Sequence, residues 1–156
     1  MDLSKSDKSL IGKLIALDAL RHRALMKAVW LLAAARWQHM TRPIESVLTD
    51  FDNPSNGEAA TDKEAELVGW AITSAAARVP WRSDCLLQAM AAARWLEALD
   101  RSYSLSIGVR KGDTGSIEAH AWLTSSQNTI TGHTSDLATY HPITGSEHKA
   151  DSFHFL

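Results

Sequence analysis

Residues 104–124 read SLSIGVRKGDTGSIEAHAWLT, and this stretch decides the fold class. Apolar side chains alternate with small or polar ones over 105–109 and again over 117–124, and a period of two predicts β-strands. Residues 111–115 between them are rich in Gly, Asp and Thr, which are turn formers. The stretch therefore predicts an antiparallel hairpin.

Helical patterns fill the chain before this hairpin. Ala- and Leu-rich segments and capping signals predict four helices, near 9–16, 19–40, 61–79 and 84–99. The residues expected to cap the last three are Asp18, then Thr61 or Asp62, then Ser83 or Asp84. Thr49 to Gly57 concentrates turn formers and is expected to be a loop.

Helices followed by antiparallel strands are typical of an α+β fold, with a helical N-terminal half packed on a small antiparallel sheet. Two more short strands are expected, near 129–131 and near 138–143, the last ended by Pro142. We expect a single domain over residues 1–156. It would divide into a helical N-terminal extension (1–60), a catalytic core (61–144) and a polar tail (145–156).

Composition and charge exclude several classes of protein. With 45% hydrophobic and 22% charged residues, a chain of 156 residues suits one globular domain. A net charge of −2 gives no general attraction to nucleic acid. The longest apolar run, Ala28 to Ala35, is too short to span a membrane. One cysteine cannot form an internal disulfide, and residues 1–5 lead into no signal-peptide segment, so we expect a cytoplasmic protein.

Cys85 stands out by its position. It falls in the first turn of a predicted helix, where free backbone N–H groups and the helix dipole favour a thiolate, and Arg78 and Arg82 add positive charge. A thiolate is the attacking species of a nucleophilic cysteine. The alternative is a buried, inert thiol, since free cysteine is among the most buried residue types.

His120 is the second candidate, in the middle of a predicted strand that would hold its imidazole rigidly, as a general base requires. Taken alone, a single histidine in this position favours a structural role, in the core or at the surface. A cysteine at a helix start followed by a histidine on a strand is, however, the chain order of papain-like and transglutaminase-like enzymes. Together, Cys85 and His120 predict thiol acyl-transfer chemistry.

The residues around this pair are VPWRSDCLLQA at 79–89, LSIGV at 105–109 and EAHAWL at 118–123. Together they resemble the transglutaminase-like leader peptidases of lasso-peptide biosynthesis. The resemblance covers about 78–132, and the helical N-terminal half is similar to the helical segment of the standalone members. It implies a cysteine protease, without a metal or other cofactor, that removes the leader from a ribosomally made precursor peptide. Its implied partners are a small leader-recognition protein and a macrolactam-forming cyclase.

In that family the cysteine is the nucleophile, the histidine the base, and an Asp on the strand after His-Ala-Trp orients the imidazole. Cys85 and His120 match. Residues 128–132 carry no carboxylate, so the orienting residue departs from the family pattern. Asp136 from the following loop is our first choice, and Asn128 or a main-chain carbonyl are the alternatives.

The tryptophans and the basic residues of the N-terminal half are the remaining features of the sequence. Trp81 and Trp122 flank the motif residues and are expected to line a substrate cleft, whereas Trp30, Trp37, Trp70 and Trp95 are expected in the core of amphipathic helices. The basic residues from Arg21 to Lys27 are expected on a solvated helix face, with an acidic partner or a membrane surface as alternatives. Two other functions remain open: a crosslinking transglutaminase-like acyltransferase, and a non-catalytic peptide-binding module.

Overall fold

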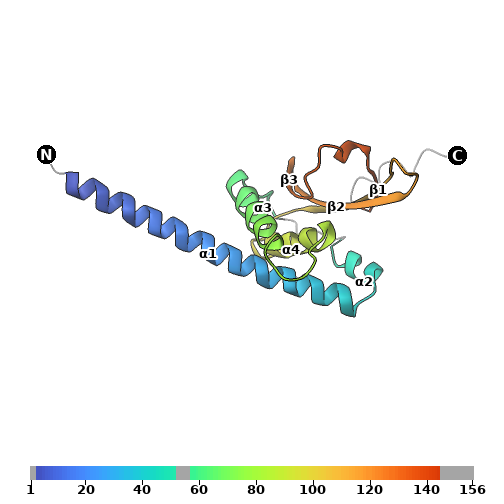
Figure 1. The fold of residues 1–156 in the computed structure, drawn as a ribbon, viewed down its shortest axis with the longest axis horizontal. Coiled ribbons are helices and arrows are strands. Elements are labelled where there is room, and N and C mark those ends of the chain that lie inside the picture. The colour runs from blue at the N-terminus through green and yellow to red at the C-terminus, as the bar shows by residue number, and fades with distance from the viewer. Residues whose placement is uncertain (1–2, 52–56, 145–156) are drawn as a thin grey trace.

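The computed structural model describes residues 3–51 and 57–144, and side chains over 17–51 and 57–143. Helices α3 (Asp62–Ala76) and α4 (Cys85–Ala98) pack on one face of an antiparallel sheet, and the long helix α1 (Leu3–Thr41) packs on these two helices (Figure 1). The short helix α2 (Ile44–Thr49) follows α1. The predicted α+β class is confirmed. The expected polar tail, 145–156, lies outside the described residues.

The first two predicted helices are one. α1 runs without interruption from Leu3 to Thr41, so the expected break and cap at Asp18 are wrong. Asp18 lies inside the helix, where its backbone oxygen accepts a hydrogen bond from His22 Nδ1 at 3.0 Å. The physical reason is that residues 13–41 contain neither Gly nor Pro, so one exposed Asp cannot stop propagation.

The capping signals of the later helices are confirmed. At the start of α3, the Thr61 side chain accepts from the backbone of Glu64, and the Glu64 carboxylate accepts from the backbone of Thr61 at 2.8 Å. At the start of α4, Asp84 accepts from the backbone N–H of Leu87 at 3.3 Å. This cap fixes Cys85 as the first residue of its helix.

The sheet has the strand order β3-β2-β1-β4. Its strands are β1 (Ser104–Lys111), β2 (Ile117–Ser125), β3 (Asn128–Thr131) and β4 (His141–Thr144). The predicted hairpin is confirmed: β1 and β2 pair in a register that places Gly108 opposite His120. β3 pairs with β2, and its end lies beside the part of β2 that carries the histidine.

The last strand differs from the expectation. Residues 137–139 form a short 3-10 helix, and β4 contains Pro142 instead of ending there. β4 is an edge strand that pairs only with β1, and Pro142 lies at a register shift opposite Gly108. An edge strand tolerates proline because the missing N–H leaves no unpaired acceptor in the sheet interior.

Of the four tryptophans expected in the core, one is buried and three are not. Trp95 is in the core at 5% exposed, as expected. Trp30, Trp37 and Trp70 are 69%, 70% and 38% exposed, so their expected core positions are wrong. α1 buries a stripe of smaller side chains instead: Ala24, Ala28, Leu31, Leu32 and Ala35. Small residues allow α1 to lie close to α3 and α4.

Candidate active site

The start of α4 presents Cys85 at an open helix end. Asp84 caps the backbone N–H of Leu87, and the Gln88 side chain donates to the backbone oxygen of Ser83 at 2.9 Å, which holds the approach to the helix. The half-buried Cys85 packs against the core. Among the described residues, nothing accepts a hydrogen bond from its backbone N–H. That N–H is therefore available to a developing oxyanion.

The thiol of Cys85 lies against the backbone of β2 directly beside His120. The backbone N–H of Ala121, the residue after His120, donates to Sγ of Cys85 with an N···S distance of 3.4 Å. One carbonyl carbon separates this nitrogen from the Cα of His120, so Sγ lies within about 6 Å of that Cα. The structure thus places the thiol beside the backbone of His120, and within the described residues no hydrogen bond joins Sγ to the imidazole.

The imidazole of His120 is held by a backbone carbonyl. Its Nε2 lies 2.9 Å from the oxygen of Gly132, one residue beyond the end of β3. A carbonyl oxygen only accepts hydrogen bonds, so this contact assigns the proton of neutral His120 to Nε2. The lone pair then lies on Nδ1, which is the nitrogen free to act as a base.

Gly132 suits this role because it has no side chain. Its φ is +81°, and a Cβ would lie 2.5 Å from the backbone oxygen of Ala121 and 2.7 Å from Cβ of Trp122. Both constraints require glycine. A main-chain carbonyl was one of the expected alternatives, but the only signal for Gly132 itself is a glycine directly after a short strand.

Aromatic rings surround the imidazole. Trp122 stacks near it with ring centroids 6.3 Å apart, and Tyr140 lies 5.4 Å away at a tilt. Gly108, opposite His120 in the register, leaves room for these rings, since a Cβ there would lie 2.8 Å from the Trp122 ring. The packing limits the rotamers open to His120.

Comparison with known families now identifies the fold. The model of the transglutaminase-like superfamily matches residues 28–145, which include the C-terminal part of α1 and the whole sheet. The chain belongs to the transglutaminase-like superfamily. Cysteine peptidases and acyltransferases are common in this superfamily. Neither the curated proteins nor the solved structures that were compared contain a match.

Two predicted partners for His120 in this transglutaminase-like site are placed elsewhere. The carboxylate of Asp136 lies 3.3 Å from Arg110 Nη1, and the Asn128 side chain donates to Asp62 at 2.9 Å. Within the described residues neither side chain hydrogen-bonds His120. The structure therefore does not bring Asp136, our first choice of orienter, to the imidazole.

Arg110 links Asp136 to the aromatic group without reaching His120. It pairs with Glu118 at 2.8 Å and lies over the Tyr140 ring at 4.7 Å. The hydrogen bond to Glu118 is the main cause that raises the pKa of Arg110 above its ordinary value. The guanidinium is thus a fixed positive charge behind the ring that packs on His120.

The two tryptophans predicted to line the cleft differ in position. Trp122 is 8% exposed and packs beside His120. Trp81 is half-buried against the core, and its Nε1 is buried with no hydrogen-bond partner among the described residues. Whether either contacts substrate stays a prediction.

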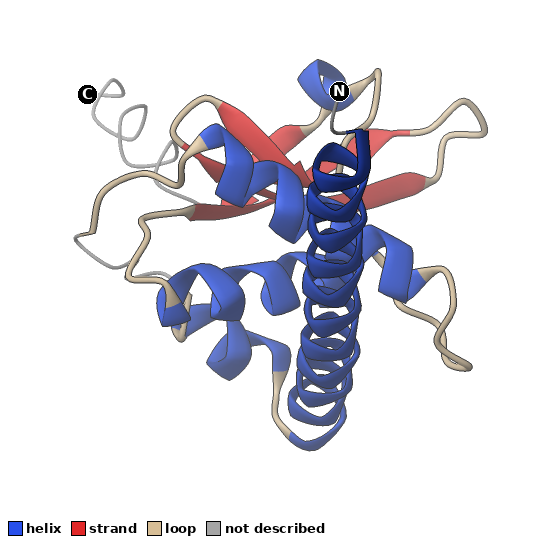
Figure 2. Cartoon of the chain, turned by 90° about the vertical axis from the view of Figure 1, so that its left-hand side faces the viewer, coloured by secondary structure: helices blue, strands red, loops and turns tan. Residues whose placement is uncertain are grey.

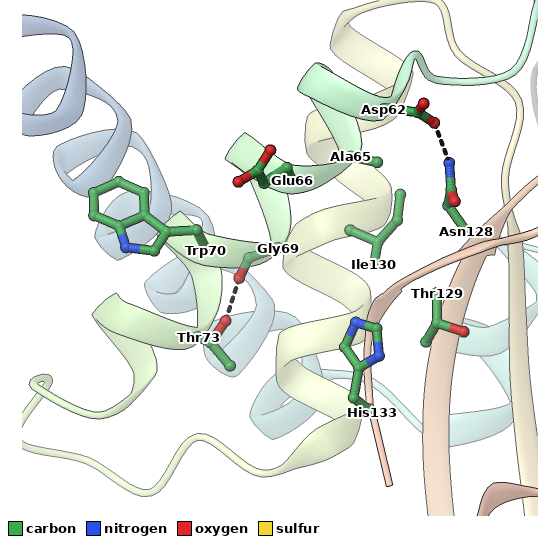
Figure 3. Close-up of a pocket in the computed structure, with 10 residues that line it drawn as sticks. All are labelled: Asp62, Ala65, Glu66, Gly69, Trp70, Thr73, Asn128, Thr129, Ile130 and His133. Atoms are coloured by element: carbon green, nitrogen blue, oxygen red, sulfur yellow. Dashed lines mark hydrogen bonds between the residues drawn. The ribbon is translucent and has the colours of Figure 1, made fainter. Parts of the chain in front are cut away.

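A groove of about 400 Å³ lies between α3 and β3 (Figure 3). Glu66, Trp70 and Thr73 line it from α3, and Thr129 and Ile130 line it from β3. Its lining also includes His133, which directly follows the carbonyl that holds His120. The groove thus reaches the segment that holds the His120 imidazole.

The described part of the chain offers neither a metal site nor a membrane span. No group of three or more His, Cys, Asp or Glu side chains there has the geometry to hold a metal ion. His133 and His141 line two different grooves. No described helix combines the length and the apolar character that a membrane span requires.

Proposed function

We propose that this chain is a cysteine peptidase that removes the leader from the ribosomally made precursor of a lasso peptide. The observation that carries the proposal is the thiol of Cys85 against the N–H of Ala121, next to an imidazole whose Nε2 is held by Gly132. The motifs VPWRSDCLLQA and EAHAWL support the narrower assignment through their resemblance to leader peptidases.

The reaction follows from the groups present. Nδ1 of His120 takes the thiol proton of Cys85, and Sγ attacks the carbonyl carbon at the junction of leader and core. The backbone N–H of Cys85 stabilises the oxyanion. His120 then protonates the departing amine, which frees the N-terminus of the core peptide and leaves the leader as a thioester on Sγ.

Hydrolysis completes the cycle. His120 removes a proton from water, the hydroxide attacks the thioester carbonyl, and the thiol regains its proton as the leader departs with a free carboxylate. The groove between α3 and β3 is suited to the extended chain before the scissile bond, because it runs toward His133 and has both apolar and polar walls. No step requires a metal.

The proposal includes partners. A separate small protein recognises the leader, and a cyclase closes the macrolactam on the freed core. The helical half of this chain supports that division of labour, because α1 packs on α3 and α4 and so contributes to the core of the catalytic domain. Full-rate cleavage of the precursor by this protein alone would contradict the dependence on a leader-recognition protein.

The test is intact-mass analysis of a precursor encoded near this chain, incubated with the protein and the neighbouring small leader-recognition protein. We expect one cut between leader and core. Cys85→Ala should abolish this cleavage while the circular dichroism spectrum and melting temperature stay nearly unchanged. Cys85→Ser, which keeps the shape of the side chain, serves as the isosteric control.

Other results of the mass analysis would indicate a different function. A joined product in the presence of an amine indicates a crosslinking acyltransferase, and an unchanged precursor bound by the protein indicates a peptide-binding module. A Cys85→Ala variant that cleaves normally contradicts the thiol mechanism. A variant that unfolds shows that the thiol has a structural role.

A further inference from the structure

The outward face of α1 carries a row of large apolar side chains that nothing described in the structure covers. Met26, Trp30, Trp37 and Met40 are between 68% and 70% exposed, and Ala33 between them is also exposed. We call these five residues the outer stripe. Figure 1 shows α1 along one border of the molecule, with α3 and α4 on its other side, and Figure 2 shows α1 in front of the remaining elements.

The spacing of the outer stripe indicates what shape of partner fits it. Its members follow one another at intervals of four, three, four and three residues. This is the a/d pattern of a coiled-coil seam, which is narrower than the apolar face of a helix that lies in a membrane surface. The occupant that this geometry favours is another helix.

Charge next to the stripe indicates the chemistry of that helix. Arg23 lies one heptad before Trp30, at the N-terminal end of the stripe, and Arg36 borders the stripe directly before Trp37. Neither pairs with a carboxylate among the described residues. Between 17 and 41, α1 has four Lys or Arg residues and a single acidic one, Asp18. A second copy would place basic flanks against basic flanks, whereas a helix with acidic flanks would be complementary.

Lys27 is directed to the body of the protein and not to a partner. Its ammonium lies 4.5 Å from the centre of the Trp95 ring, which belongs to α4, and partial burial lowers its pKa. It therefore helps to anchor α1 to the body. The arginines are the charges directed to a partner.

We propose that the outer stripe binds an amphipathic helix of a partner protein, with an apolar a/d seam and Glu or Asp at the flanking positions. Trp30 and Trp37 form the centre of the contact, in keeping with the enrichment of Trp at interface hot spots. The site lies on the face of α1 opposite the core, and it does not depend on the proposed peptidase activity.

The probe is a synthetic helix of about four heptads with Leu at a and d and Glu at e and g, labelled with a fluorophore. Fluorescence anisotropy should show saturable binding that weakens at about 0.5 M salt. Trp30→Gln combined with Trp37→Gln should weaken binding by about tenfold or more. Trp70→Gln, which removes a partly exposed Trp from α3, is the matched control and should leave binding within about twofold.

Reversing the charge of the two arginines tests the proposal independently of the tryptophans. Arg23→Glu with Arg36→Glu should weaken binding of the Glu probe and strengthen binding of the same helix with Lys at e and g. All the substituted side chains except Arg36 are exposed, so circular dichroism should show folded variants.

Three results would overturn the proposal. One is failure of the Glu probe to bind the wild-type chain, or equal binding by the double Trp variant. A second is a dimer in sedimentation velocity that the double Trp variant loses, which assigns the stripe to a second copy. The third is binding to phosphatidylglycerol vesicles but not to the Glu probe, which assigns it to a membrane surface.

Discussion

At Gly132 two independent constraints act on one position, a φ of +81° and a Cβ site 2.5 Å from the backbone oxygen of Ala121. Gly132→Ala should therefore displace the carbonyl that holds Nε2 of His120. We expect cleavage turnover to fall by about tenfold or more, with KM changed less, since orientation of the base matters most in the transition state. Steady-state kinetics on the precursor would measure this.

Gly115 provides the matched control. Its φ is +80°, but a Cβ there would meet only Cε of Lys111, at 3.9 Å. Gly115→Ala should cost about 1–2 kcal/mol in the free energy of unfolding, from the left-handed backbone alone, and leave turnover nearly intact. Equal turnover of the two variants would show that the Gly132 carbonyl does not position His120.

The placement of Asp136 on Arg110 leads to a different expectation from the sequence. Asp136→Asn removes an ion pair that is exposed and does not touch the imidazole, so turnover should stay within about threefold of wild type. Asn128→Ala should behave similarly, because the Asn128 amide donates to Asp62. A loss of about a hundredfold for Asp136→Asn would instead identify this carboxylate as the orienter.

At the scale of one element, the start of α3 links helix capping to pH. The hydrogen bond from Arg101 and then that from the Thr61 backbone lower the pKa of Glu64 from 4.5 to about 2. A depressed pKa in the folded state stabilises the protein above pH 4.5, and this contribution disappears as pH falls toward 2. Glu64→Gln should therefore be less stable than wild type at pH 7, with the difference shrinking between about pH 4.5 and 2.

Urea denaturation at several pH values measures this difference. Glu66→Gln is the control, because Glu66 lies on the same helix, is exposed, and has no ion pair or cap contact within the described chain. Its stability difference from wild type should be small at every pH. A pH-independent defect in Glu64→Gln would show that the carboxylate charge does not stabilise α3.

Elements whose signals are local could be predicted from the sequence, and elements set by tertiary packing could not. The Thr61 and Asp84 caps and the β1–β2 hairpin depend on neighbouring residues, and all three were predicted. Which face of α1 is buried could not be predicted, because the helix carries two apolar stripes, one of Ala and Leu and one of Met and Trp. Hydrophobicity alone favours the larger side chains, whereas close packing against α3 and α4 selects the smaller ones.

The candidate site shows the same division at the scale of the whole molecule. Cys85 and His120 could be proposed because a helix start and a strand each give a sequence signal, and the fold places the Cys85 thiol against the backbone of β2 beside His120. For the carbonyl of Gly132 the sequence offers only a glycine directly after a short strand, because every residue has a backbone carbonyl. Its position depends on how β3 ends, and that depends on the packing of α3 against β3.

At Gly69 the helix α3 lies close to the backbone of β3. A Cβ there would lie 2.6 Å from the backbone oxygen of Ile130, so α3 and β3 approach to a distance that only glycine permits. In a free helix, Gly→Ala adds up to about 1 kcal/mol of stability. Here Gly69→Ala should destabilise the protein by about 1–3 kcal/mol in urea denaturation, because a backbone oxygen cannot move aside as a flexible side chain can. The displacement should also reach Gly132 through β3 and lower cleavage turnover. A Gly69→Ala variant that is more stable than wild type would show that α3 does not pack closely on β3 at this position.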